Sequence, residues 1–290
     1  MLLRLLVGLL FTGSLLPAQT ITPPEDPLSQ QEIRALINTA AEKDLENNKR
    51  SHAYTYVQRQ EDHRLNGKGE TQSSESKTYE VMILYEDTVL RLIEKNDKPL
   101  PLKDAEKEEE RIQKIIDKRK NESEGDRRKR LEKEEKGRRD ARDFVQEISD
   151  AYNFHHVGME NLDGRESYVI DAEPRPGYEP RHKEAKILPK FRFRGWIDKT
   201  ESQWVKLDAQ CIDTVSFGLF LARIHKGSQV DIEQTRINHE VWLPQHVKVK
   251  IDARIALLKG VNVESDITYR DYKKFHTEVK IVPGQEVTQR

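Results

Sequence analysis

Histidine, cysteine and paired carboxylates carry out most protein chemistry, and in this chain none of them stands in a familiar arrangement. Of the nine histidines, His155 and His156 are the adjacent pair. Neighbouring residues of a strand point to opposite faces, so this pair is poorly placed to bind one metal ion. Histidines further along the chain lack the i, i+4 or H-x-H spacing of a zinc centre, namely His182, His225, His239, His246 and His276. We expect surface or hydrogen-bonded histidines, with no metal and no cofactor.

Catalytic motifs built on glycine-rich turns or a metal-binding helix are missing as well. The chain has no G-x-S-x-G elbow, no P-loop, no G-x-G-x-x-G after a strand and no H-E-x-x-H. Its single cysteine, Cys211, cannot form an internal disulfide. The strand-like context VKLDAQCIDTV indicates a buried, inert thiol. We therefore expect a protein that is not an enzyme.

The most unusual composition lies between residues 103 and 143, where 30 of 41 residues are charged, 16 basic and 14 acidic. A nucleic-acid surface concentrates one sign of charge so that phosphates are neutralised. Here both signs are interleaved, which favours a solvated pair of helices crossed by salt bridges. We expect no nucleic-acid partner.

Local signals divide this charged block into two helices. A thin apolar stripe at helical spacing is formed by Ile112, Ile115 and Ile116. Gly125 interrupts the pattern, and Ser123 with Asp126 marks a new helix start. The stretch DFVQEISDAYNF then restores an apolar face. The prediction is a charged helical hairpin over residues 103–150, inserted into a sheet.

The chain opens with a targeting segment, MLLRLLVGLLFTGSLLPA, in which Arg4 precedes an apolar run over residues 5–11. The run is short for a membrane span, so we expect a signal peptide over residues 1–18, cleaved near residue 18; the alternative is an uncleaved anchor. No cysteine stands near this point for lipid attachment. We expect export to the periplasm, a flexible proline-rich leader over 19–28 and a C-terminal tail over 282–290.

Between leader and tail, periodicity predicts one domain over residues 29–281. Ser29 and Glu32 form a capping-box pattern at the start of an amphipathic helix. From Ser51 the period changes to two, with tight-turn signals at Asn66-Gly67 and Asp163-Gly164. No βαβ alternation appears, which favours a strongly curved antiparallel sheet with added helices. The fold class is thus α+β, mainly antiparallel β, and we expect a monomer.

Alternating strands predict a sheet with one dry face. The stretch FRFRGWIDKTESQWVKLDA, residues 191–209, predicts a hairpin with its turn at 198–202 and with Val205 and Leu207 on the inner face. A large sheet curls, so its hollow side must be filled or must hold something. The helices either fill that hollow or cover an apolar cavity. The candidate cavity residues are Val81, Ile83, Phe193, Val205, Leu207, Phe217, Leu219, Val247, Val249 and Ile251.

Four of these stretches resemble one known family. GWIDKTESQWVKLDA, DGRESYVIDAEP, INHEVWLPQHVKVKI and DITYRDYKKF are similar to strands of the outer-membrane lipoprotein-sorting, or LolA-like, superfamily. The resemblance covers roughly residues 160–276, and the charged hairpin departs from it. It implies an incomplete, strongly bent antiparallel half-barrel whose open mouth is covered by helices. In that superfamily the hollow accommodates acyl chains, and some members act as envelope-stress sensors.

Two functions follow as hypotheses. The first is a periplasmic carrier or binder of a lipid-like ligand or an acylated protein in an apolar half-barrel cavity, without catalysis. The alternative is an envelope sensor or interaction scaffold, with the charged helical hairpin as the arm that binds an envelope protein.

Overall fold

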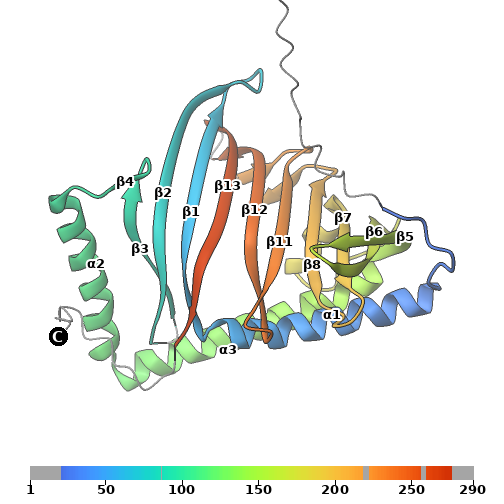
Figure 1. Cartoon of the computed structure of the whole chain (residues 1–290), viewed down its shortest axis with the longest axis horizontal. Coiled ribbons are helices and arrows are strands. Elements are labelled where there is room, and N and C mark those ends of the chain that lie inside the picture. Colours follow the sequence, from blue (N-terminus) through green and yellow to red (C-terminus); the bar gives the residue numbers. More distant parts are fainter. Residues whose placement is uncertain (1–20, 86, 218–221, 256–258, 276–290) are drawn as a thin grey trace, which may run out of the picture.

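The computed structural model describes residues 21–85, 87–217, 222–255 and 259–275 (Figure 1). The predicted signal peptide and C-terminal tail lie outside these residues. The helices are α1 (Gln30–Ser51), α2 (Leu102–Lys120), α3 (Glu124–Ala151) and the short 3-10 helix η1 (Glu184–Lys190). None of these helices is long and apolar enough to cross a bilayer.

Thirteen strands form one sheet, and the pairings among the described strands are antiparallel. The main strand order is β4-β3-β2-β1-β13-β12-β11-β8-β7-β6-β5. In addition, β10 pairs with β12, and β9 pairs with β10. Among the described residues, β4 and β5 are not paired with each other, so the curved sheet stays open (Figure 1). This confirms the expected unclosed antiparallel sheet with helices. The strands are β1 (Tyr54–Leu65), β2 (Thr71–Leu84), β3 (Asp87–Lys95), β4 (Lys98–Pro99), β5 (Tyr152–Leu162), β6 (Arg165–Pro174), β7 (Phe191–Asp198), β8 (Trp204–Cys211), β9 (Val215–Phe217), β10 (Ala222–Ile224), β11 (Gln229–Ile237), β12 (Val241–Ile255) and β13 (Lys259–Lys274).

Helix α1 begins at the predicted cap and covers part of one sheet face. The Glu32 carboxylate accepts the Ser29 N–H at 2.8 Å, and the Ser29 hydroxyl accepts the Glu32 N–H at 3.3 Å. The apolar side of α1 is buried in the main core, against residues of β5, β6, β7 and η1. This core includes Ile33, Ile37, Ala40, Tyr152, Phe154, Ile170, Ile197 and Leu188.

Helix α2 lies along β3, which the two-residue strand β4 pairs only near its C-terminal end, so that most of β3 forms the edge of the sheet (Figure 1). The Glu108 carboxylate accepts the Leu92 N–H at 2.8 Å, and the Arg111 guanidinium donates to the Leu90 carbonyl. The unpaired backbone groups of an edge strand are a template for aggregation. The charged insertion therefore protects this side of the sheet.

The hairpin of β7 and β8 turns where the sequence predicts, since β7 ends at Asp198 and β8 begins at Trp204. The Asp198 carboxylate accepts the N–H groups of Thr200 at 3.0 Å and Glu201 at 2.6 Å, and Arg165 Nε–H at 2.7 Å. Burial raises the pKa of Asp198, but these hydrogen bonds outweigh burial and hold that pKa below its usual range. A charged carboxylate thus organises the turn.

A β-bulge in β8 changes the alternation just after this turn. The pairs on either side of it are Trp196–Lys206 and Ile197–Trp204, which leaves Val205 as the extra residue. Val205 packs beside Trp196, whereas Leu207 lies opposite Gly195 on the other face. The prediction that Val205 and Leu207 share a face is therefore wrong, because one extra residue reverses the facing of a strand.

Residues 21–28, expected to form a mobile leader, make specific contacts along the other edge strand, β5. Thr22 and Met159 exchange two backbone hydrogen bonds of 2.8 and 2.9 Å. The Leu28 N–H donates to His156 Nδ1 at 3.2 Å. The approach is close: a Cβ on Gly158 would lie 2.2 Å from the Thr22 carbonyl oxygen. This part of the leader thus covers the β5 edge.

Candidate functional site

The pairing register shows which residues share each face of the sheet. Phe193 packs against the core beneath α1. Its row continues across the sheet through Ala209, Val230, Val249 and Ser265. The next row on that face runs through Gly195, Leu207, Ile232, Val247 and Ile267. We call this face the inner face and the opposite one the outer face.

An aliphatic patch crosses β8, β11, β12 and β13 on the inner face. It consists of Leu207, Val230, Ile232, Val247, Val249, Ile251, Val263 and Ile267. Each of these side chains is half-buried. By contrast, Ile170 and Ile197 on the inner face of β6 and β7 are 2% and 0% exposed. The patch is therefore apolar sheet surface that the described helices leave partly open.

The position of α1 explains this difference. It packs on β5 and β8 and reaches β12, where the Asn47 amide makes two hydrogen bonds of 2.6 and 2.7 Å with the Trp242 backbone. Trp242 is the second residue of β12, so α1 crosses the strand near its beginning (Figure 1). The patch residues of β12 begin five positions later, at Val247. Helix α1 thus meets β12 at one end, short of the patch.

A tyrosine cluster borders the patch. The Tyr56 ring lies 5.9 Å from that of Tyr269 and 5.1 Å from that of Tyr272, between centroids. Tyr269 follows Ile267 by two positions and so shares the inner face. Burial raises the pKa of Tyr56, and burial with the nearby Tyr56 raises the pKa of Tyr269 to about 12. The phenols are neutral at physiological pH and extend the surface as an amphipathic border.

The predicted cavity residues do not all belong to one site. Leu207, Val247, Val249 and Ile251 belong to the patch, and Phe193 lies beside the core. Val81 and Ile83 lie on the inner face of β2, beyond the tyrosines, where Val81 pairs with Tyr56 and is buried. Val205 lies on the outer face. Phe217 belongs to β9, and Leu219 lies outside the described residues.

Sequence reasoning missed half of the patch, namely Val230, Ile232, Val263 and Ile267. The signal was present, because SQVDIEQTRI and VESDITYRDY both alternate apolar and polar residues. Alternation separates two faces of a strand but does not say which one faces the helices. That assignment required the register with β8 and β12.

The side chains of His156 and Cys211, which could in principle do chemistry, make structural hydrogen bonds. His156 Nδ1 accepts the Leu28 N–H, so its proton lies on Nε2, which donates to the Gly158 carbonyl at 3.0 Å. Cys211 is 1% exposed and its thiol donates to the Asp213 carbonyl at 3.0 Å; burial raises the pKa of this thiol. Among the described residues, no three His, Cys, Asp or Glu side chains are grouped so as to hold a metal ion.

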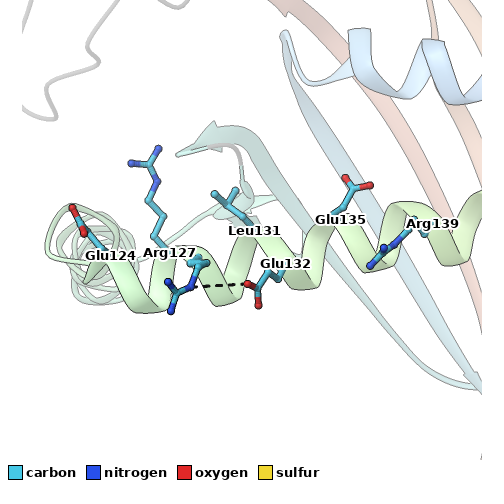
Figure 2. A pocket seen from close by; sticks show the side chains of 7 residues that line it. Glu124, Arg127, Leu131, Glu132, Glu135 and Arg139 are labelled. Carbon is cyan, nitrogen blue, oxygen red and sulfur yellow. Dashed lines mark ion pairs between the residues drawn. The ribbon is translucent and has the colours of Figure 1, made fainter.

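The first half of α3 forms a second candidate surface. It is an open surface whose described residues all belong to α3: Glu124, Arg127, Arg128, Leu131, Glu132, Glu135 and Arg139. Figure 2 shows Leu131 among these charged side chains, and 37% of it is exposed.

Ion pairs link charges along α3 and the turn before it, while α2 and α3 leave that turn in different directions (Figure 1). Arg130 lies 3.1 Å from Glu122 and 3.0 Å from Glu134. The Arg128–Glu132 pair at 4.0 Å is dashed in Figure 2. The start of α3 also follows its predicted cap, since the Ser123 hydroxyl accepts the Asp126 N–H at 3.1 Å.

Comparison of the chain with known proteins finds similar solved structures. No family model matches the chain, and no curated protein matches it. One similar structure is a putative outer membrane lipoprotein-sorting protein domain from Vibrio parahaemolyticus, with 8% identity over 84% of this chain and 95% of that one, at a TM-score of 0.34. A lipoprotein-sorting domain, which the sequence resembles, is thus among the similar structures.

Two further structures have comparable scores. A DUF1329 family protein from Desulfovibrio piger is 13% identical over 83% of this chain and 92% of that one, at a TM-score of 0.30. A MucA/MucB complex from Pseudomonas aeruginosa contains a chain that is 11% identical, with 82% and 93% covered and a TM-score of 0.23.

Proposed function

We propose that the protein is a non-catalytic, periplasmic binder or carrier of a lipid-like or acylated ligand, which lies on the open part of the inner face. The aliphatic patch carries this proposal. Its eight valine, isoleucine and leucine side chains lie in register over four strands and remain half-buried. Contiguous exposed apolar surface marks interaction sites. An acyl chain would bury it without needing polar partners.

Removal of water would provide the affinity. Each acyl methylene that leaves water contributes about 0.8 kcal/mol. The tyrosine cluster suits the boundary between chain and headgroup, because a tyrosine ring is apolar while its hydroxyl bonds to polar groups. Polar residues limit the surface on β1, where Asp62 accepts from Gln60 at 2.9 Å and from Ser265.

Binding of a fluorescent fatty acid tests this proposal, with neighbouring residues of β12 as matched sites. Val249 belongs to the patch, whereas Lys250 pairs with Glu264 at 2.7 Å and faces outward. We expect Val249→Ser to weaken probe binding at least tenfold and Lys250→Ser to leave it unchanged. Native mass spectrometry of the purified wild type should recover a bound lipid. Equal affinity in all three proteins, or no binding by the wild type, contradicts the proposal.

The alternative, an envelope sensor or scaffold that binds a protein through the hairpin, has one specific observation in its favour. Leu131 is exposed in the middle of the most charged part of α3. Under this alternative, Leu131→Glu abolishes capture of an envelope protein, while Ala141→Glu further along α3 does not. Fatty-acid binding that survives Leu131→Glu separates the two functions.

A further inference from the structure

The rows of the aliphatic patch continue beyond β13 onto β1, β2 and β3, where they become polar and charged. Arg64 lies directly opposite Val263, and Gln60 lies opposite Ile267, so the change occurs between two neighbouring strands. These strands lie side by side in the sheet (Figure 1). We call the continued rows the charged strip, which consists of Gln60, Asp62, Arg64, Ser73, Glu75, Lys77 and Lys95. An apolar surface and a charged surface therefore adjoin on the inner face.

Two lysines of the charged strip share one carboxylate. Lys77 and Lys95 stand directly opposite each other on β2 and β3, where like charges repel. Each ammonium lies 2.9 Å from the Glu75 carboxylate. Hydrogen bonds from Lys95 and Lys77 lower the pKa of Glu75 to about 2, so this carboxylate remains charged at physiological pH. An ammonium has three N–H donors, so each lysine retains donors beyond the one that Glu75 takes.

These remaining donors are accessible from solvent. The side chains of Lys77 and Lys95 are 34% and 53% exposed. Arg64 is exposed as well, and within the described part of the chain its guanidinium makes no ion pair. The strip therefore presents three cations that a ligand on the inner face can reach.

The carboxylates of the strip, by contrast, are already occupied. Asp62 accepts from the Gln60 amide at 2.9 and 3.0 Å and from the Ser265 hydroxyl, so both of its oxygens have neutral partners. Both lysines donate to Glu75. Three cations thus stand with two carboxylates, and the cations hold the unused hydrogen-bonding capacity. Charge-assisted hydrogen bonds to an anion would use it.

We infer that the ligand of the aliphatic patch is an anionic single-chain amphiphile whose headgroup lies on the charged strip, between Arg64 and the two lysines. Its acyl chain crosses β13, β12 and β11 toward β8, a span of about 19 Å from β1 because neighbouring strands lie about 4.8 Å apart. The inference rests on the proposed lipid-binding function, to which it adds the charge and the direction of the ligand.

Two ligands with the same acyl chain test the charge. Dodecyl phosphate is anionic, whereas dodecylphosphocholine has the same chain and phosphate together with a compensating cation. In isothermal titration of the full chain, with each ligand below its micellar concentration, we expect dodecyl phosphate to bind at least tenfold more tightly. Equal binding of the two overturns the inference and leaves the proposed function intact. Binding of neither overturns both.

A pair of matched double variants locates the headgroup. Arg64→Gln/Lys95→Gln removes two exposed cations of the strip, so the preference for dodecyl phosphate should disappear. The unfolding midpoint should not change, since exposed ion pairs contribute little to stability. The control, Lys248→Gln/Lys250→Gln, removes the same charge from exposed positions on the outer face of β12 and should keep the preference.

Dodecylphosphocholine should bind alike to the wild type and both double variants, because the patch is unchanged. A preference for dodecyl phosphate that survives in Arg64→Gln/Lys95→Gln overturns the inference. An equal loss of preference in the two double variants also overturns it, since the net charge of the protein would then account for the effect.

Discussion

Two parts of one sheet have apolar inner faces, but the helices fully bury only one of them. In β5–β7, residues such as Tyr152, Ile170 and Ile197 are at most 2% exposed, because α1 and η1 pack on them. In β8 and β11–β13, the aliphatic patch remains half-buried. We call these parts the covered half and the open half. The position of a helix, and not the composition of the strands, makes one half core and leaves the other as surface.

Because of this difference, residues of the covered half should matter mainly for stability, and residues of the open half mainly for the proposed binding. Apolar side chains stabilise a fold to the extent that they leave water on folding. Packing against α1 gives the covered half that stabilisation. Under the proposed function, the open half gains it when a ligand binds there. Substitutions of the same chemical kind should therefore have different consequences in the two halves.

The largest effect is expected for Ile197→Ala in the covered half. Removal of a fully buried isoleucine side chain leaves a cavity, so the free energy of unfolding should fall by about 3 kcal/mol. Urea denaturation measures it. The matched change in the open half is Ile232→Ala, which should cost about 1 kcal/mol because that side chain is already partly in water. Equal costs at the two sites would show that the halves are buried alike.

The second largest effect on stability is expected at Glu147, whose hydrogen bonds attach α3 to the covered half. The buried Glu147 carboxylate accepts from the Tyr178 hydroxyl and from the Arg181 and His182 N–H groups. We expect Glu147→Gln to lower the free energy of unfolding at pH 7 by about 2 kcal/mol, since bonds to a charged group are lost. Denaturation of the variant and the wild type at pH 7 measures this difference.

The same residue predicts a dependence on pH. Burial raises the pKa of Glu147, but its hydrogen bonds outweigh burial and hold that pKa below the ordinary 4.5. Its contribution is therefore complete above pH 4.5 and declines as the pH falls through the lowered pKa. Glu147→Gln should lose less stability than the wild type on acidification. Identical slopes in both proteins would contradict this account.

The third substitution is expected to stabilise the protein. It concerns Asp208 on the outer face of β8, where the open half meets the covered half. Burial, with the neighbouring Asp231, raises the pKa of Asp208 from 3.8 to about 6, although Lys206 and Arg194 oppose the shift. The folded state then binds more protons than the unfolded state between about pH 4 and 6, so stability falls as the pH rises through that window.

Asp208→Asn should remove this loss and raise the free energy of unfolding at pH 7 by about 1 kcal/mol, after allowance for solvent screening. Thermal unfolding from pH 4 to 7 measures it. Asp171→Asn is the control, because Asp171 pairs with Arg194 at 2.6 Å and its loss should not stabilise the protein. A variant at position 208 that is less stable than the wild type at pH 7 contradicts the prediction.

The smallest effect is expected outside both halves, in the charged hairpin. Arg128 pairs with Glu132 at 4.0 Å on the solvated surface of α3, and their side chains are 77% and 71% exposed. Exposed ion pairs contribute little and are screened by salt. Arg128→Gln should leave the denaturation midpoint unchanged within error, at low and at high salt. A clear loss of stability would show that the hairpin belongs to the structural core.

The sequence was sufficient for the parts of the fold that depend on neighbouring residues. The Ser29–Glu32 capping box, the Ser123 cap and the turn organised by Asp198 arise from short-range hydrogen bonds. Two-residue alternation likewise indicated the strands. Composition indicated that the charged block would be a solvated helix pair, since interleaved charges satisfy one another locally.

Tertiary structure decided which apolar residues are core and which are surface. The bulge moved Val205 to the outer face, and the register placed Val230, Ile232 and Ile267 beside Leu207 on the inner one. The α1 helix then buried Ile197 and left Ile232 partly exposed. Periodicity records that a strand has two faces, but burial depends on contacts between segments far apart in the chain.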